Sequence, residues 1–517
     1  MKLLKYLIIF CFIFSLCHAA DNCATLTRSA SIVKYDNKLK TLLKSSSPCV
    51  YIPGGTWEFD NPITVPDGKY ILGNYTNIHT VSANDTVYGT TIACRHSIGL
   101  DSINFDHSCI IMGKNSGVKG LNLIWPEQKA HMKATAHATP VQYPWGITCI
   151  GGGGSCTIEN VTLSNSYNGI YIYNANNNYI HNVNMSAYKR GIIFDGGTDI
   201  GTVNNMNIHD MLHWWYYGWA MGGDTWNNEI PYLENYWLYN NLTGVEVKNV
   251  TRAGLLQGIF IYKAKYGFLF DQLNNNQSGQ LIQSNVYNSG CDLCNYSVKI
   301  KQIGTNKLLH YFNSQAFGKV EIDAGAYGNA YFENSQMQYY VGESEPNGNK
   351  NHINHLSQNL SLNLVNCDIT TSGLSGKQFN ASVIYANGPT ILRNVNMISP
   401  YVYTDGYDAP FGLQWLADYI LEEYGTISEN AKHITVASGY ATVYYVTGHI
   451  LGYNSFRAKY VNSVVPEIGF GFVKPMGQWT SDNIRYVCNE HLPDAACYLV
   501  DDDPNYRYRP RYTVDEL

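Results

Sequence analysis

The sequence is poor in charged residues and has no excess of basic ones. Asp, Glu, Lys and Arg make up 14% of its 517 residues, and the formal net charge is −6. The solvent-facing sides of helices need many charged residues, so this scarcity argues against a mainly helical protein. A balance of 34 basic against 40 acidic side chains offers no surface for phosphate groups, so nucleic acid is not expected as a partner. The 46 glycines and 42 tyrosines suit turns and strands.

After residue 20 the chain lacks any apolar run long enough to cross a bilayer. Residues 1–20, MKLLKYLIIFCFIFSLCHAA, place Lys2 and Lys5 before a short apolar run and end in small residues. This pattern predicts a secretory signal peptide over residues 1–20 and a secreted, extracellular mature protein. The last four residues, VDEL, resemble an endoplasmic-reticulum retention signal, so the lumen of that compartment is the alternative location.

Cysteines are the next guide to the compartment. Ten of the eleven that follow residue 20 are near neighbours in sequence, which in an oxidising compartment predicts local disulfides and leaves Cys367 over. A metal site at residues 291–294 (CDLC) would need a second ligand pair nearby, and none is visible. Ten Asn-x-Ser/Thr sequons, Asn160 among them, allow a glycoprotein. The predicted disulfide pairs are Cys23 with Cys49, Cys94 with Cys109, Cys149 with Cys156, Cys291 with Cys294, and Cys488 with Cys497.

Two short patterns recur along the chain. In the first an Asn precedes an apolar strand, as in ENVTLSN at 159–165, HNVNMSA at 181–187 and NNMNIHD at 204–210. In the second a Gly precedes apolar residues, and these glycines recur about every 22–27 positions, a period typical of stacked coils. Each coil of such a stack buries its apolar residues against its neighbours. The second pattern starts at Gly169, Gly191, Gly218, Gly244 and Gly267.

The fixed period predicts an all-β fold, a right-handed parallel β-helix over residues 21–400, with the handedness taken from the crossover rule. A β-sandwich also has many short strands, but it would not keep two patterns in one order at one period. Residues 401–517 differ: an amphipathic helix is expected over 409–431, followed by strands over 432–453. We expect this part to form a small α+β cap or module that closes the stack.

The segment VYIPGGTWEFDNPITVPDGKYILGN at 50–74 resembles the opening coil of the pectate-lyase superfamily. Pro53, Gly55 and Trp57 match its first turn, residues 63–66 its apolar stretch, and residues 72–73 its closing turn. The resemblance implies a right-handed β-helix, in a superfamily of polysaccharide lyases, glycoside hydrolases, phage tailspikes and non-catalytic surface proteins, with trimers among them. The NTD, DD, GHG and RIK motifs of polygalacturonases are absent, so no particular activity follows.

The stretch HWWYYGWAMGGDTW at 213–226 lengthens the spacing between the recurring glycines. Insertions in repeat folds project from one face, often the binding face. Exposed aromatic rings suit sugars, whose apolar ring faces lie flat on them. A hydrophobic plug and a protein-binding patch are the alternatives. The predicted sugar-binding residues are Trp214, Trp215, Tyr217, Trp219, Trp226, Tyr236 and Trp237.

The residue four places after each recurring glycine is expected to form a column, comprising Tyr173, Asp195, Gly222, Lys248 and Asp271, with Glu246 on the same side. Glycoside hydrolysis needs two carboxylates about 5–10 Å apart, and Asp195 with Asp224 is the preferred pair. A lyase would need a base such as Lys248, and often a calcium ion, whereas a hydrolase needs no cofactor. The structural alternatives are turn acids, a helix cap at Asp224 and an ion pair between Lys248 and Asp271. The catalytic candidates are therefore Asp195, Asp224, Glu246, Asp271 and Lys248.

The sequence thus predicts a secreted β-helix protein that acts on a polysaccharide as a glycoside hydrolase or a lyase. The alternative is a non-catalytic surface, coat or adhesin-like protein that binds a glycan or a protein.

Overall fold

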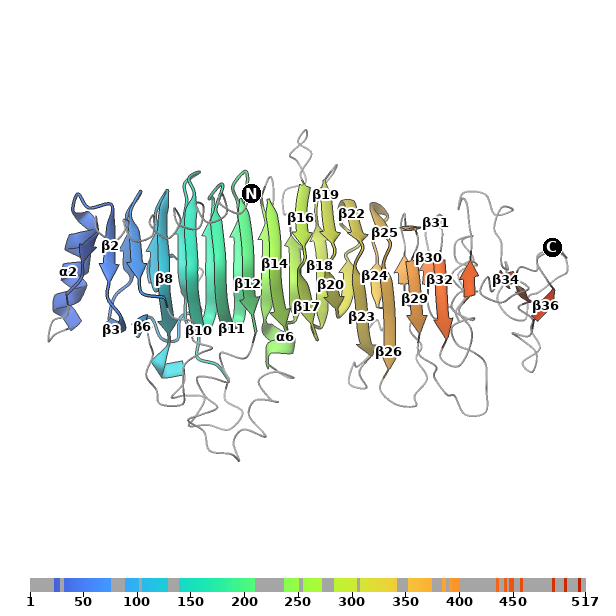
Figure 1. Cartoon of the computed structure of the whole chain (residues 1–517), viewed down its shortest axis with the longest axis horizontal. Helices are drawn as coiled ribbons and strands as arrows, with labels where there is room; N and C mark the ends of the chain where they lie inside the picture. The colour runs from blue at the N-terminus through green and yellow to red at the C-terminus, as the bar shows by residue number, and fades with distance from the viewer. Residues whose placement is uncertain are drawn as a thin grey trace, which may run out of the picture. The chain divides into compact units, whose positions relative to one another are not determined.

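The computed structural model describes residues 23–27, 32–75, 89–101, 105–128, 139–209, 237–250, 254–271, 283–304, 307–341 and 352–373, together with short strands between residues 384 and 512. The chain divides into two units, residues 1–265 and 266–517. Strands predominate in both (Figure 1). Within the described residues no helix has the length and apolar character needed to span a bilayer.

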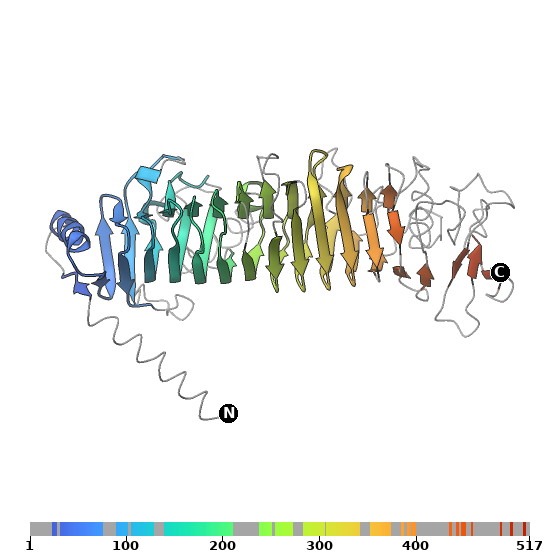
Figure 2. The ribbon, with the colours of Figure 1, turned by 90° about the horizontal axis from the view of Figure 1, so that it is seen from above.

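The first unit is a stack of coils whose strands form three parallel sheets (Figure 2). The first sheet runs β1–β2–β5–β8–β10–β11–β12–β14, the second β3–β6–β8–β10–β11–β12–β14, and the third β4–β7–β9–β10–β11–β13; the long strands bend and join more than one sheet. The strands are β1 (Ala24–Thr25), β2 (Cys49–Ile52), β3 (Gly55–Phe59), β4 (Ile63–Val65), β5 (Tyr70–Gly73), β6 (Thr90–Cys94), β7 (Ile110–Met112), β8 (Ser116–Ile124), β9 (Trp145–Ile150), β10 (Cys156–Tyr173), β11 (Tyr179–Asp195), β12 (Thr202–Ile208), β13 (Thr243–Lys248) and β14 (Leu255–Tyr262).

The predicted right-handed parallel β-helix is confirmed by this architecture. The segment 50–74 forms the predicted opening coil, β2 to β5. The helix α2 (Ile32–Lys44), which the sequence reasoning missed, packs on that coil and buries Leu39 and Leu43. Their spacing of four residues is the helical signal that could have revealed it. Two short helical turns, η2 (Phe105–His107) and α6 (Tyr239–Asn241), lie between strands.

The core of each coil is one layer of a continuous apolar column. In the third sheet Ile147, Ile170, Ile192 and Val245 are register partners, each with no exposed surface. Strands of successive coils lie about 4.8 Å apart, so these side chains bury one another. The coil interior therefore accepts apolar residues at alternate positions, and the intervening residues face outward.

The recurring glycines have a steric cause. A Cβ added to Gly169 would lie 2.4 Å from the carbonyl oxygen of Gly191, and one added to Gly191 would lie 2.4 Å from that of Gly244. Any side chain would collide with the next coil. The register also corrects one prediction: β11 pairs directly with β13, so Gly191 is followed by Gly244 in the third sheet. The segment from Gly218 lies outside the described residues.

The second unit also has three parallel sheets, β16–β19–β22–β25–β28–β31, β17–β20–β23–β26–β29–β32 and β15–β18–β21–β24–β27–β30. Its early strands are β15 (Tyr266–Asp271), β16 (Gln283–Tyr287), β17 (Gly290–Asp292), β18 (Tyr296–Gln302), β19 (Leu308–Phe312), β20 (Gln315–Phe317), β21 (Lys319–Ile322), β22 (Tyr327–Glu333), β23 (Gln336–Val341), β24 (Ile353–His355), β25 (Asn359–Val365) and β26 (Asp368–Gly373).

The later strands of this unit end the parallel stack. Strands β30 to β32 still pair in parallel with the preceding coil, and β33 to β36 pair antiparallel. The strands expected over 432–453 are thus confirmed, whereas the helix expected over 409–431 lies outside the described residues, and a module boundary at residue 400 stays a prediction. The later strands are β27 (Ile384–Ala386), β28 (Thr390–Arg393), β29 (Val395–Ser399), β30 (Ile434–Val436), β31 (Ala441–Val443), β32 (Val446–Ile450), β33 (Phe456–Ala458), β34 (Tyr486–Cys488), β35 (Cys497–Leu499) and β36 (Pro510–Tyr512).

Asparagine ladders hold the corner between the first and second sheets of the first unit. Asn160, Asn182 and Asn205 all have a left-handed backbone, with φ of 53°, 52° and 57°. The Asn182 amide donates to the Asn160 side-chain oxygen at 2.6 Å, and the Asn205 amide donates to Asn182 at 3.2 Å. Asn tolerates this backbone better than most residues, which explains why it precedes each strand in the first repeated pattern.

The second unit also has left-handed asparagines at equivalent corners, and their positions explain the unpaired Cys367. Ser289, Ser314 and Ser335 each follow a left-handed Asn, and each hydroxyl donates to the carbonyl oxygen two residues earlier. Cys367 follows the left-handed Asn366, and its thiol donates to the Val365 carbonyl at 3.4 Å. Burial raises the pKa of this thiol to about 12. Cys367 thus fills a hydroxyl position of the ladder, as a buried thiol.

Four of the five predicted disulfides are present: Cys23–Cys49, Cys94–Cys109, Cys149–Cys156 and Cys291–Cys294. The last excludes the metal alternative for CDLC. Cys488 and Cys497 are cross-strand partners in β34 and β35, and their bond stays a prediction.

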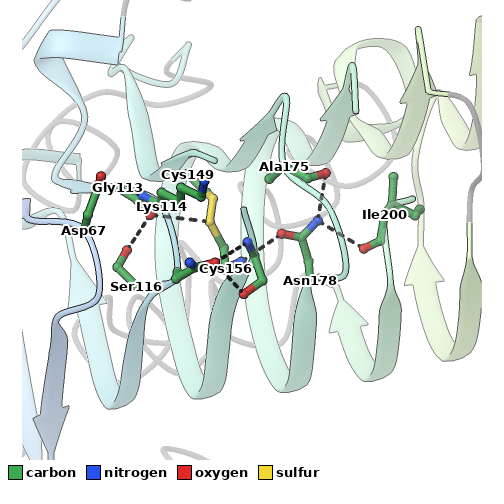
Figure 3. Close-up of a disulfide and its surroundings, with 11 residues drawn as sticks. Asp67, Gly113, Lys114, Ser116, Cys149, Cys156, Ala175, Asn178 and Ile200 are labelled. Carbon is green, nitrogen blue, oxygen red and sulfur yellow. Dashed lines mark hydrogen bonds between the residues drawn. A yellow bond between two sulfur atoms is a disulfide. The ribbon is translucent and has the colours of Figure 1, made fainter. Parts of the chain in front are cut away.

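The corner that joins the third sheet to the next coil is tied by the Cys149–Cys156 disulfide and an adjacent amide (Figure 3). The Asn178 side chain accepts from the Cys156 backbone at 3.0 Å and donates to the Ile200 carbonyl at 3.1 Å. One side chain therefore links three successive coils.

The ladder predicts a graded loss of stability at Asn182. Asn182→Ala removes two side-chain hydrogen bonds and forces a left-handed alanine, so we expect it to cost about 2–3 kcal/mol. Asn182→Gly removes the same hydrogen bonds but accepts the backbone, so the loss should be smaller by about 1 kcal/mol. Denaturant unfolding followed by circular dichroism measures both. Equal losses in the two variants would show that the left-handed backbone contributes nothing.

Two buried histidines predict a loss of stability in mild acid. Burial lowers the pKa of His352 to about 3 and of His355 to about 4, from the ordinary 6.5. The unfolded chain therefore binds more protons below pH 6.5, and stability falls as the pH drops from 6.5 towards 4. At pH 5 the loss is about 2 kcal/mol per histidine. Calorimetric melting at pH 7.5 and pH 5 measures it, and His352→Leu should narrow the difference in Tm. An unchanged difference in that variant would contradict the assignment.

Candidate functional site

The outer face of the third sheet in the first unit carries the predicted column. Tyr173, Asp195 and Lys248 are register partners in β10, β11 and β13. Their neighbours in sequence, such as Phe194 and Val247, fill the core, so by the alternation of a strand these three face outward. Gly222 is not part of the column, because Lys248 directly follows Asp195 in the stack.

Asp195 is the centre of a polar network on this face. Its carboxylate accepts hydrogen bonds from the Tyr171 hydroxyl at 2.7 Å and the Asn249 amide at 2.9 Å. The Lys248 ammonium lies 3.1 Å from the same carboxylate. The Asp195 side chain is 14% exposed. Three donors of this kind hold the carboxylate in one orientation.

Four aromatic rings form a layer beside this carboxylate. Trp145 stacks on Tyr171 at 4.9 Å between ring centroids, and Phe105 stacks on the same tyrosine at 5.4 Å. Tyr173 lies 5.1 Å from Phe105 and is 39% exposed. We call Trp145, Tyr171 and Tyr173 the aromatic face, on which Phe105 packs from the connection over residues 95–109. Trp145 and Tyr171 are buried and cluster with Ile193, the half-buried Phe105 packs against this cluster, and Tyr173 is the exposed ring at its edge. Flat aromatic rings of this kind are ones on which sugar rings stack.

A second carboxylate acts on the same tyrosine. Burial, the hydrogen bond to Asp195 and the charges of Asp195 and Glu246 together raise the pKa of Tyr171 well above its ordinary value. Glu246 is partly exposed and is the register partner of Ile193, two residues before Asp195 in the stack. Diagonal neighbours of this kind lie about 7–8 Å apart at their Cα atoms. Asp195 and Glu246 are thus a carboxylate pair on one face.

Long connections cluster at one corner of this unit. Residues 95–109, 125–144 and 209–242 each join a second-sheet strand to a third-sheet strand. Between them in the stack, residues 165–168 of β10 and 187–190 of β11 turn the same corner within a continuous strand. The two coils that carry Tyr171, Tyr173 and Asp195 therefore lie between coils with long connections.

The connection over residues 95–109 contacts the corners at 165–168 and 187–190 through the side chain of Asp101. Its carboxylate accepts from Arg190 at 3.0 Å, from the Asn168 amide at 3.2 Å, and from Lys189. Arg190 also lies over the Trp145 ring, 5.8 Å from its centroid. Burial raises the pKa of Asp101, but the hydrogen bonds from Lys189 and Asn168 and the charge of Arg190 lower it more, and the net pKa is below the ordinary value. Sequence reasoning missed this residue, because nothing local in DSINF marks it.

The remaining predicted residues fall into three groups. Asp271 belongs to the second unit and pairs with Lys301 at 2.8 Å, and Lys248 of the first unit pairs with Asp195 at 3.1 Å. The Trp237 indole donates to the Tyr188 carbonyl at 3.1 Å, a packing contact that agrees with the plug interpretation for that residue. The following residues lie outside the described part: Asp224, Trp214, Trp215, Tyr217, Trp219, Trp226 and Tyr236.

No cluster of three or more His, Cys, Asp or Glu side chains is positioned to bind a metal ion within the part of the chain that the structure describes. Several charged groups there form ion pairs. In the second unit, for example, Lys299 bridges Glu321 and Asp323.

No protein-family model matches the sequence, and no curated protein sequence does. Among solved structures, the catalytic domain of a GH87 α-1,3-glucanase in complex with nigerose is 12% identical, over 82% of this chain and 68% of its own, with a TM-score of 0.38. A polygalacturonase from Erwinia carotovora is 11% identical, over 73% and 93%, with a TM-score of 0.38. DFA-IIIase from Arthrobacter chlorophenolicus A6 is 8% identical, over 84% and 89%, with a TM-score of 0.33. The fold assignment itself rests on the strand register of this chain.

The network around Asp195 predicts a measurable coupling. Asp195→Asn and Lys248→Met each break the ion pair, so the double variant should be more stable than the sum of the two losses predicts, by about 1 kcal/mol. Urea unfolding of the wild type, the two single variants and the double variant gives this coupling energy. Strict additivity would mean that the two charges do not stabilise each other.

Proposed function

We propose that this protein is a secreted glycoside hydrolase that acts on a polysaccharide at the outer face of the third sheet. The observation that carries the proposal is the pair Asp195 and Glu246, whose charges both act on Tyr171 within the aromatic face. Paired carboxylates next to a surface for sugar rings are the requirements of glycoside hydrolysis. The four disulfides fit an oxidising compartment.

The two carboxylates have different roles in this proposal. Asp195 is bound by a phenol, an amide and an ammonium group, and a carboxylate held in one orientation in this way suits the role of nucleophile or base. Glu246 lies on the neighbouring coil, partly exposed, and is the group that would protonate the leaving oxygen. A hydrolase of this kind needs no cofactor.

A lyase on the same face is the less favoured reaction. It needs a free base for the proton beside a uronate carboxyl, and the ammonium group of Lys248 is occupied by Asp195. A non-catalytic glycan-binding protein is the second candidate function. The observation in its favour is that Asp195 already accepts three contacts and is mostly buried, as in a structural carboxylate.

A polysaccharide panel separates these functions. Products are assayed as new reducing ends, and as ultraviolet absorbance from unsaturated uronates. We expect reducing ends without that absorbance on at least one substrate, and we expect Asp195→Asn and Glu246→Gln each to lower kcat by about 10²–10⁴-fold.

The matched control is Asp67→Asn, which removes one carboxylate of the same unit whose oxygen accepts from the Lys114 backbone. Its rate should equal that of the wild type. Unsaturated products would convert the assignment to a lyase. If a polysaccharide binds but gives no product, and Asp195→Asn and Glu246→Gln bind it as the wild type does, the result supports the non-catalytic function.

A further inference from the structure

One connection of the first unit lies on the proposed site itself. Residues 94–101 and 105–109, which we call the strap, join β6 to β7 and are closed at their base by the Cys94–Cys109 disulfide. The strap starts in one coil, passes the next coil, β8–β9, and contacts the following two through Asn168 of β10 and Arg190 of β11. A connection that only closed its own coil would not need this reach.

The Asp101 carboxylate of the strap accepts hydrogen bonds from a set of donors that converge on it. Lys189, Arg190 and Asn168 come from two different coils and bind the same carboxylate. Arg190 also donates to the Asn168 side-chain oxygen at 2.9 Å, which orients the guanidinium group from within the stack. This set of donors does not come from the strap, and it has the composition of a site for a carboxylate group.

The Phe105 ring of the strap occupies the aromatic face. It stacks on Tyr171 with an angle of 23° between the planes and also meets Tyr173. A sugar ring bound on this face would take the same place. The strap therefore presents one carboxylate and one flat ring to the two parts of the site.

We propose that the strap is a built-in occupant of the site: Asp101 and Phe105 take the places of the carboxylate and the ring of an acidic sugar residue. The inference rests on the proposed function, because it assigns regulation and substrate class to that same face. The ligand that displaces the strap is an anionic saccharide. Two donors of the set, Lys189 and Arg190, carry a positive charge that a neutral sugar would leave unpaired. The Cys94–Cys109 disulfide limits how far the strap can withdraw.

The experiment measures binding of tri-galacturonate and of the neutral maltotriose by calorimetry at low ionic strength. Asp101→Ala should raise the affinity for tri-galacturonate about tenfold and leave maltotriose unchanged, because it frees the charged donors. Phe105→Ala should raise the affinity for both sugars. Adding Arg190→Ala to Asp101→Ala should remove the gain.

The matched control is Asp106→Ala, which removes the same charge from an exposed position on the same strap. It should not change either affinity. An equal gain in Asp106→Ala, or no gain in an Asp101→Ala protein with an unchanged melting curve, overturns the proposal. If Asp101→Ala unfolds at lower temperature, Phe105→Ala alone decides, since it keeps every ion pair.

Binding is read without turnover, so the two proposals fail separately. If the protein hydrolyses a polysaccharide but the strap variants show no gain in sugar affinity, the proposed function stands and the proposal for the strap is wrong. If the strap variants bind the sugars more tightly but no polysaccharide gives a product, the proposal for the strap stands and the proposed hydrolase activity is wrong.

Discussion

The structure depends on the vertical contact between equivalent positions of successive coils. A single coil encloses too few apolar atoms to be stable, and residues such as Ile170 are buried only because Ile147 and Ile192 lie directly above and below them. The same constraint acts on the main chain, where Gly169 and Gly191 leave room for the neighbouring carbonyl oxygen. It also acts at the corners, where asparagine side chains bind one another from coil to coil. The interior requires apolar residues, the backbone requires glycines and the corners require asparagines at equivalent positions of successive coils. The repeated patterns in the sequence follow from these requirements.

This dependence decides what could be predicted from the sequence. The period of the glycines and the asparagine-led strands follow directly from vertical contact, so the fold was predicted correctly. Four disulfides were predicted correctly from the short sequence separation of their cysteines. The alignment of Tyr173, Asp195 and Lys248 was also correct. The prediction failed for the place given to Gly218, because β11 pairs directly with β13 and Gly218 itself lies outside the described residues. Periodicity counts residues and cannot tell a coil from an insertion of similar length.

The candidate site was harder to predict for a related reason. Its partners come from connections of unequal length, and such contacts have no period. Asp101 is 89 positions from Arg190 in sequence, yet the two side chains form an ion pair. Phe105 meets Tyr171 in the same way. Outward-facing residues are also free of the packing constraint, so their chemistry varies from coil to coil. The aromatic residues that the sequence did bring to attention lie mostly in 213–226, and the rings that form the aromatic face come from other segments.

The reach of the strap has an evolutionary side. A stack of equivalent coils has approximate translational symmetry, so gene duplication or deletion of one whole coil would leave every interior contact satisfied. The Asp101 contacts break that symmetry, because they can form only when a fixed number of coils separates β6–β7 from β11. Insertion or loss of a coil within this interval would separate the carboxylate from Arg190 by about 4.8 Å for each coil. We therefore expect homologous chains to vary in coil number outside this interval and to keep it constant inside.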